Sequence, residues 1–177
     1  MATLNFKAGV KKDDLTEFSR SVLADIANAA GFDLLISETT RSPYQQAVVM
    51  YNNLTKWKET PMTLIGSEAR QRGLYKPGGK AVVDVFVENN SAKKSRFEII
   101  NAMVNKINEQ PSAVSTHLVS PKIVNAVDVS YSCIKDRHKF LEAVKRWQPY
   151  TIPPNGCHEE SYNHCIHLDI YQPSQIA

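Results

Sequence analysis

The stretch Cys165-Ile166-His167-Leu168-Asp169-Ile170 decides how the rest of this 177-residue chain is interpreted. Its apolar residues alternate with His167 and Asp169, and an alternation of period two predicts a β-strand, here over residues 164–171. Residues two apart in a strand point to the same face of a sheet, so His167 and Asp169 are expected side by side. The hexapeptide therefore predicts a strand with two titratable groups on one face.

Two titratable residues earlier in the chain are expected to join this strand. Ser115-Thr116-His117 is followed after ten residues by Asp128, which interrupts an apolar strand pattern over residues 124–129. An ionised carboxylate at a half-buried position is costly unless it is paired or bound to a cation. Two imidazoles and one carboxylate can hold Zn²⁺ and leave a fourth position for a water whose pKa falls to about 7. We therefore predict that His117, Asp128 and His167 form a divalent-metal site.

The same three residues also fit a domain without metal. In that interpretation His117 lies on a loop, Asp128 caps a turn and His167 is hydrogen-bonded within the sheet. The spacing alone leaves both interpretations open.

Composition sets the broad class of protein. The chain is 42% hydrophobic and 22% charged, with 21 Lys and Arg against 18 Asp and Glu, as in an ordinary globular domain. A net charge of +3 is too weak to argue for nucleic acid but allows attraction to an anionic polymer such as bacterial cell wall. Three cysteines argue against a disulfide framework and for free thiols.

The sequence contains no targeting signal that we recognise. Residues 1–12 are polar and lack the apolar core of a signal peptide, and no window is long and apolar enough to predict a membrane span. We therefore expect a protein that is cytoplasmic at synthesis.

Helices and strands do not alternate regularly along the chain, which favours an α+β fold over a doubly wound one. We expect a single domain over residues 1–177: a small antiparallel sheet with helices packed around it and the metal site at its open face. The expected helices cover residues 13–30 (capped by Asp13 or Asp14 and stopped by Gly31), 43–57, 64–72, 91–108 and 134–147. The expected strands cover residues 33–37, 81–87, 124–129 and 164–171, with turn-rich or rigid loops at 73–79 and 149–156.

Three motifs in order give the chain a family resemblance. They are Thr40-Arg41-Ser42-Pro43-Tyr44-Gln45-Gln46, then Ser115-Thr116-His117 with Asn125-Ala126-Val127-Asp128, then His164-Cys165-Ile166-His167-Leu168-Asp169. The chain resembles the D-Ala-D-Ala carboxypeptidase/L-alanyl-D-glutamate endopeptidase group of zinc peptidases, which cut bacterial peptidoglycan peptides. The resemblance spans residues 36–170, and the Gly- and Pro-rich segment 73–80 looks like a loop of phage endolysin members.

The resemblance implies a role for each matching residue. His117, Asp128 and His167 would bind Zn²⁺, and Arg41 would stabilise the developing negative charge on the substrate. Ser115, Gln46 and Asp169 would line the substrate pocket, with Gln46 supporting Arg41. The implied substrates are peptidoglycan stem peptides, and a phage lysis or virion-associated enzyme is one implied setting.

The chain departs from the family pattern in two places. The loop between His117 and Asp128 is longer than in the family, and the family's glycine is absent. The family's catalytic acidic residue is replaced by His164, which can itself act as a general base near neutral pH. Glu159 or Glu160 could instead take that role from the loop. If no base is present, the chain would be a non-catalytic peptidoglycan-binding or structural module of the same fold.

A dense group of possible ligands lies near the last strand. It contains Cys157, His158, His164, Cys165 and His167, but its spacing matches no standard Cys/His zinc module. We therefore expect His158 to be solvated and Cys165 to be a buried, inert thiol.

Overall fold

The computed structural model describes residues 1–55, 72–73, 75–151, 156–160 and 163–176. Its backbone divides into two compact units. We call Met1–Thr40 with Val119–Ala177 the sheet unit and Arg41–Leu118 the helical unit. The single domain expected from the sequence stays a prediction, and each unit is described by itself.

The sheet unit contains a five-stranded sheet in the order β1-β2-β3-β5-β4. The strands are β1 (Leu4–Phe6), β2 (Leu34–Glu38), β3 (Val124–Ser130), β4 (Cys157–Glu160) and β5 (Cys165–Tyr171). All neighbouring pairs are antiparallel except β1 and β2, which run parallel. The α+β class is therefore confirmed, but the sheet is mixed rather than purely antiparallel.

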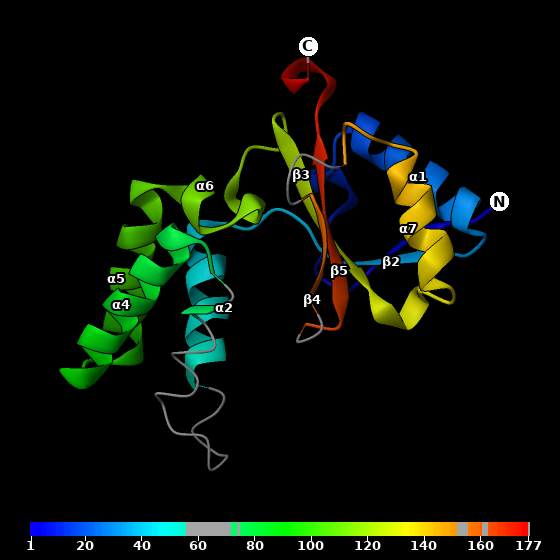
Figure 1. Ribbon diagram of the computed structural model, residues 1–177. Coiled ribbons are helices and arrows are strands. Elements are labelled where there is room, and N and C mark those ends of the chain that lie inside the picture. The colour runs from blue at the N-terminus through cyan, green and yellow to red at the C-terminus, as the bar shows by residue number, and fades with distance from the viewer. Residues whose placement is uncertain (56–71, 74, 152–155, 161–162, 177) are drawn as a thin grey trace. The chain divides into compact units, whose positions relative to one another are not determined.

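Two helices, α1 (Glu17–Ala30) and α7 (Arg137–Lys145), lie side by side against one face of this sheet (Figure 1). Apolar side chains of both helices, including Val22, Ile26 and Phe140, share one core with Val127 of β3 and Leu168 of β5. Because successive strand residues point to opposite faces, Asp128, His167 and Asp169 lie on the face away from these helices.

Helix α1 begins later than the sequence suggested. Asp13 and Asp14 lie in a short 3₁₀ helix, η1 (Lys12–Asp14), and the capping residue of α1 is Thr16, whose hydroxyl accepts from the Ser19 amide. The expected aspartate cap is therefore wrong. The expected stop is confirmed, because Gly31 closes the helix with a left-handed backbone at φ 81°.

The helical unit is built from α2 (Pro43–Thr55), α4 (Pro77–Ser91), α5 (Arg96–Glu109) and α6 (Pro111–Val114), followed by the 3₁₀ helix η3 (Thr116–Leu118). Its core combines apolar side chains from four helices, such as Met50 of α2, Phe86 of α4, Met103 of α5 and Val114 of α6. Figure 1 shows α4 and α5 packed along one another. The unit therefore has its own apolar core.

The strand expected over residues 81–87 is wrong, because these residues form the middle of α4. Val82, Val83 and Phe86 are buried at helical spacing, so packing against α5 overrides the strand propensity of the β-branched residues. The turn expected over residues 73–79 is also partly wrong, because Pro77 begins α4. Gly78 permits close packing there, since a Cβ on it would lie 2.6 Å from the carbonyl oxygen of Ala113 in α6.

The helix expected over residues 91–108 is confirmed as α5, but it begins at Arg96 rather than at residue 91, because Ser91 is still the last residue of α4. Ser95 and Glu98 form a capping box at that start. Phe97 lies in the first turn of α5 and is 71% exposed. The weak helix expected over residues 64–72 falls almost wholly outside the described residues. Strands β1 and β4 were not expected at all.

The remaining elements follow the sequence. The expected strands near β2, β3 and β5 and the expected helices near α2 and α7 are confirmed within a few residues at their ends. All three cysteines are free thiols, as expected. None of the helices in the described ranges combines the length and the apolar composition that crossing a bilayer requires.

Candidate metal centre

Strands β3 and β5 bring Asp128 and His167 together. Their register pairs the two residues directly across the sheet, and the Asp128 carboxylate lies 2.8 Å from Nδ1 of His167. Asp169, two residues further along β5, lies 3.0 Å from Nε2 of the same ring. The three side chains are buried, each with 4% of its residue surface exposed. One imidazole is thus held between two carboxylates on the sheet face opposite the helices.

The charges in this group are strongly coupled. Burial alone lowers the pKa of His167, but the hydrogen bonds and negative charges of Asp128 and Asp169 outweigh burial and raise the pKa to about 10. Without a metal, His167 is therefore an imidazolium near neutral pH. A divalent cation ligated by Asp128 and His167 would take the place of this proton and leave Asp169 to orient the ring from its other nitrogen.

Strand β4 adds two further donors on the same face. His158 pairs across from His167, and the centres of the two rings lie 4.7 Å apart. Glu160 lies 3.4 Å from Nε2 of His158 and also accepts a hydrogen bond from Asn163. The hydrogen bond from His158 outweighs burial and keeps the pKa of Glu160 below its ordinary value, so this carboxylate is ionised at neutral pH.

The two glutamates left open by the sequence point to opposite faces. Glu159 forms an ion pair with Arg137 at the start of α7, on the helix side of the sheet. Glu160 lies with the histidines. Alternation along β4 explains the difference, because neighbouring residues of a strand project to opposite sides.

His164 lies apart from this group of side chains. It is exposed, with a left-handed backbone at φ 53°, in the turn between β4 and β5. Its carbonyl oxygen accepts a hydrogen bond from the Tyr131 amide. The structure therefore gives His164 a part in the turn, and its expected catalytic role stays a prediction.

Several predicted site residues belong to the helical unit. His117 is buried in η3, and its carbonyl oxygen accepts a hydrogen bond of 2.8 Å from the Arg41 amide. The Arg41 guanidinium donates to the side-chain oxygen of buried Gln46 at 3.1 Å, which is the contact expected between them. Ser115 accepts from the His117 amide. The four residues are linked to one another, while their roles stay predictions.

Two sets of three donors within the sheet unit could each hold a metal ion. One set is His158, Glu160 and His167; the other is Asp128, Glu160 and Cys165. Within each set the donor atoms all lie within 4.8 Å of one another. The sequence drew attention to His158 and Cys165 and left Glu159 and Glu160 as alternatives, and strand β4 places Glu160 beside the two donors.

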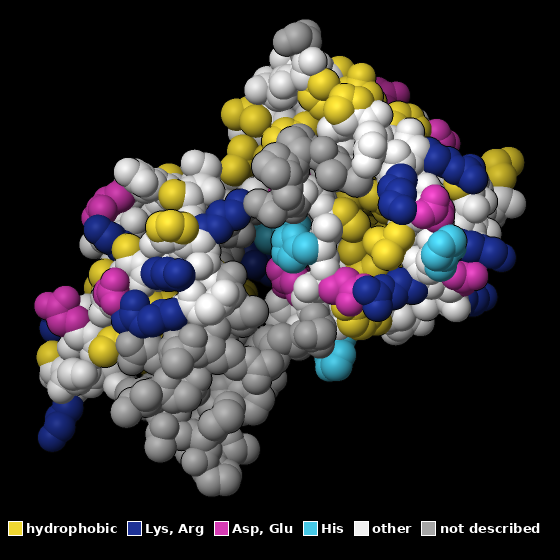
Figure 2. All heavy atoms as spheres, in the orientation of Figure 1, with side chains coloured by type: hydrophobic (Ala, Val, Ile, Leu, Met, Phe, Trp, Pro, Cys, Tyr) yellow, Lys and Arg dark blue, Asp and Glu magenta, His cyan; other side chains and the backbone are white. Residues whose placement is uncertain are grey.

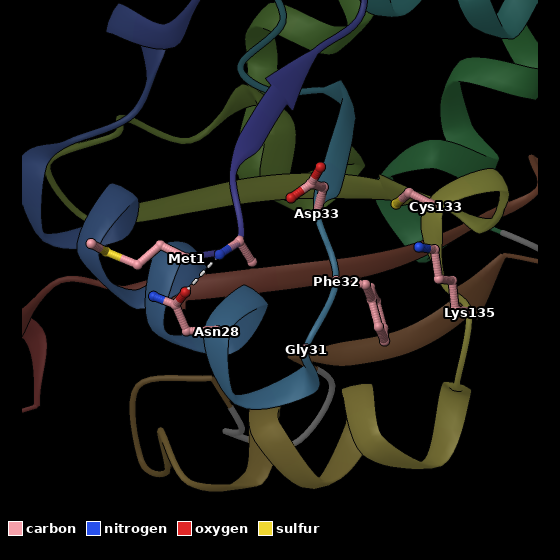
Figure 3. A pocket seen from close by; sticks show the side chains of 8 residues that line it. Met1, Asn28, Gly31, Phe32, Asp33, Cys133 and Lys135 are labelled. Atoms are coloured by element: carbon pink, nitrogen blue, oxygen red, sulfur yellow. Dashed lines mark hydrogen bonds between the residues drawn. The ribbon is translucent and has the colours of Figure 1, made fainter.

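A separate pocket of about 520 Å³ lies elsewhere in the sheet unit (Figure 3). It is lined by residues near the chain start and around β2, among them Asn28, Phe32, Asp33, Cys133 and Lys135. None of the predicted metal ligands lines this pocket. Figure 3 shows Asn28 accepting the hydrogen bond of 2.9 Å from the Ala2 amide that ties the chain start to α1.

Basic and acidic side chains are interspersed over the sheet unit on the face drawn in Figure 2. This mixed pattern agrees with the weak net charge of +3. It gives no support to a nucleic-acid partner.

No protein-family model, curated protein or solved structure matches the chain.

Proposed function

We propose that this chain is a zinc-dependent peptidase that hydrolyses peptide bonds of bacterial cell-wall peptidoglycan. The observation that carries the proposal is His167, buried between the carboxylates of Asp128 and Asp169 on the sheet face away from the core. Burying two carboxylates around one imidazole costs stability, so a role beyond packing is the better account of them.

The ligand set is completed, in this proposal, by His117. The resemblance assigns it this position, and it is buried although histidine is usually at least partly exposed. One carboxylate and two imidazoles suit Zn²⁺, which acts as a Lewis acid and lowers the pKa of a bound water to about 7. Asp169 fits the carboxylate that commonly orients a zinc-ligating histidine from its far nitrogen.

Glu160 is the proton acceptor that we propose in place of His164. Its carboxylate is ionised at neutral pH and lies on the same sheet face as His167. It can therefore take a proton from the attacking water and return it to the leaving amine. Arg41, held by Gln46, would stabilise negative charge on the substrate carbonyl oxygen.

The proposal is tested on purified peptidoglycan. We expect protein with zinc to release soluble peptides, and we expect Asp128→Ala to abolish release. His138→Ala, an exposed residue of α7, is the matched control and should keep wild-type release. Zinc-loaded wild-type protein that releases nothing would refute the peptidase.

A second candidate function is a non-catalytic module that binds peptidoglycan. It is favoured by one observation: His164, at the family's catalytic position, is exposed in a turn. Co-sedimentation with peptidoglycan, without release of peptides, would support it. A phage lysis or virion-associated setting remains part of the proposal in either case.

A further inference from the structure

The hairpin of β4 and β5 carries two metal donors, His158 and Glu160, that are not among the proposed zinc ligands His117, Asp128 and His167. His158 and Glu160 come from β4 and face His167 of β5, so all three belong to the sheet unit. No residue of the helical unit is needed to complete the set.

The separations within this set suit a metal ion. Two ligands about 2.1 Å from one ion, at a tetrahedral angle, lie about 3.4 Å apart. Nε2 of His158 and the nearer carboxylate oxygen of Glu160 are 3.4 Å apart. An ion between the two groups would therefore need little movement of either.

The three side chains of this set differ in their exposure to solvent. The side chain of His158 is 49% exposed and that of Glu160 is 30% exposed, whereas that of His167 is 5% exposed. An ion from solvent can therefore reach His158 and Glu160 without opening the core. The cost of ordering a half-exposed His158 should make binding here weaker than binding at a fully buried set.

We propose that His158 and Glu160 hold a second and weaker zinc ion on the β4–β5 hairpin, while the two nitrogens of the neighbouring His167 stay with the first zinc ion and with Asp169. An ion held there takes up the Glu160 carboxylate and prevents it from accepting a proton. Excess zinc would then inhibit the hydrolysis, and this consequence alone rests on the proposed function. The binding itself does not depend on catalysis.

Zinc binding to the full chain tests the proposal. The bound zinc is measured by equilibrium dialysis and elemental analysis. Wild-type protein should bind one zinc at low free zinc and a second as free zinc rises. His158→Ala and Glu160→Gln should each lose the second equivalent and keep the first. Glu159→Gln, changed at the neighbouring residue on the opposite face, is the matched control and should keep both.

His117→Ala separates this proposal from the catalytic one. We expect this variant to lose the first equivalent and retain the second, because the hairpin position uses no residue of the helical unit. If wild-type protein binds the second zinc ion but does not cut peptidoglycan, the peptidase proposal is refuted. The proposed second zinc position is then still supported. A second equivalent retained in full by both His158→Ala and Glu160→Gln, or absent from the wild type, would overturn the proposal.

Discussion

At the scale of single residues, the unusual feature is His167, which lies between the two buried carboxylates of Asp128 and Asp169. The ring nitrogens lie 2.8 Å from Asp128 and 3.0 Å from Asp169, so each carboxylate is hydrogen-bonded to the imidazole. The arrangement leaves one positive charge against two negative charges. A divalent cation in place of the proton would correct this imbalance, which is why we assign a metal to it.

The free energy of unfolding of the metal-free protein should decrease as the pH rises, because His167 loses its proton. Its pKa in the folded chain, about 10, is above the ordinary value of 6.5. The stabilisation is therefore fully present below pH 6.5 and is lost as the pH rises through 10, by at most about 1.4 kcal/mol per pH unit. Urea unfolding of chelator-treated protein across this range would measure it.

Zinc should reverse this trend, because the ligands must lose protons before they bind metal. The protein saturated with zinc should gain stability as the pH rises over the lower part of the same range. His167→Gln should remove the dependence in the metal-free protein. Metal-free wild type whose stability rises with pH would contradict the assignment.

Glu160 and Glu159 give a paired test of the proton acceptor. We expect Glu160→Gln to lower kcat for peptide release by about 10²–10⁴-fold, the usual contribution of a general base. Glu159→Gln should change it little, because Glu159 lies on the opposite face of β4 and its partly exposed ion pair with Arg137 contributes about 0–1 kcal/mol. Equal losses in the two variants would refute the assignment of Glu160, and loss only in His164→Asn would favour His164.

At the scale of elements, the β3–β5 pair could be predicted from the sequence and strand β4 could not. The apolar residues of β3 and β5 are interrupted by Asp128, His167 and Asp169, so both the strands and their unusual residues are visible in the sequence. Strand β4 is Cys157-His158-Glu159-Glu160, which has no apolar alternation, and it forms by pairing with β5. The side on which Glu160 lies follows from that pairing alone.

Helix α4 was predicted as a strand because local propensity and tertiary packing disagree there. Val82, Val83, Val85 and Val87 favour a strand individually, but Phe86 and the buried valines bury more apolar surface in a helix against α5. The helix was expected to begin at residue 91, whereas the capping box of Ser95 and Glu98 starts α5 at Arg96. Sequence periodicity therefore located the core residues better than the element boundaries.

Packing of α4 on α6 should be sensitive to Gly78. A Cβ added there would lie 2.6 Å from the Ala113 carbonyl oxygen, so α6 would have to move. We expect Gly78→Ala to lower the free energy of unfolding by about 1–3 kcal/mol, measured by chemical denaturation. Gly73→Ala is the matched control, since a Cβ there meets no atom within 4 Å, and it should be neutral or slightly stabilising. Equal effects of the two substitutions would contradict the packing explanation.

At the scale of the whole molecule, the predicted ligands come from both compact units. Asp128 and His167 belong to the sheet unit, whereas His117 lies near the end of the helical unit, two residues before Val119. The order of the motifs along the sequence suggested the ligand set, but nothing in the sequence indicated that the chain divides between His117 and Asp128. The central proposal is that Asp128 and His167 bind one zinc ion, with His117 as the third ligand that the resemblance implies.

The zinc content of purified protein at low free zinc tests this claim most directly, since the weaker hairpin position stays empty there. We predict about one equivalent in the wild type and in His138→Ala, and less than about a tenth of an equivalent in His117→Ala, Asp128→Ala and His167→Ala. A wild type with less than about a tenth of an equivalent, or a His117→Ala variant that keeps the full equivalent, would contradict the account.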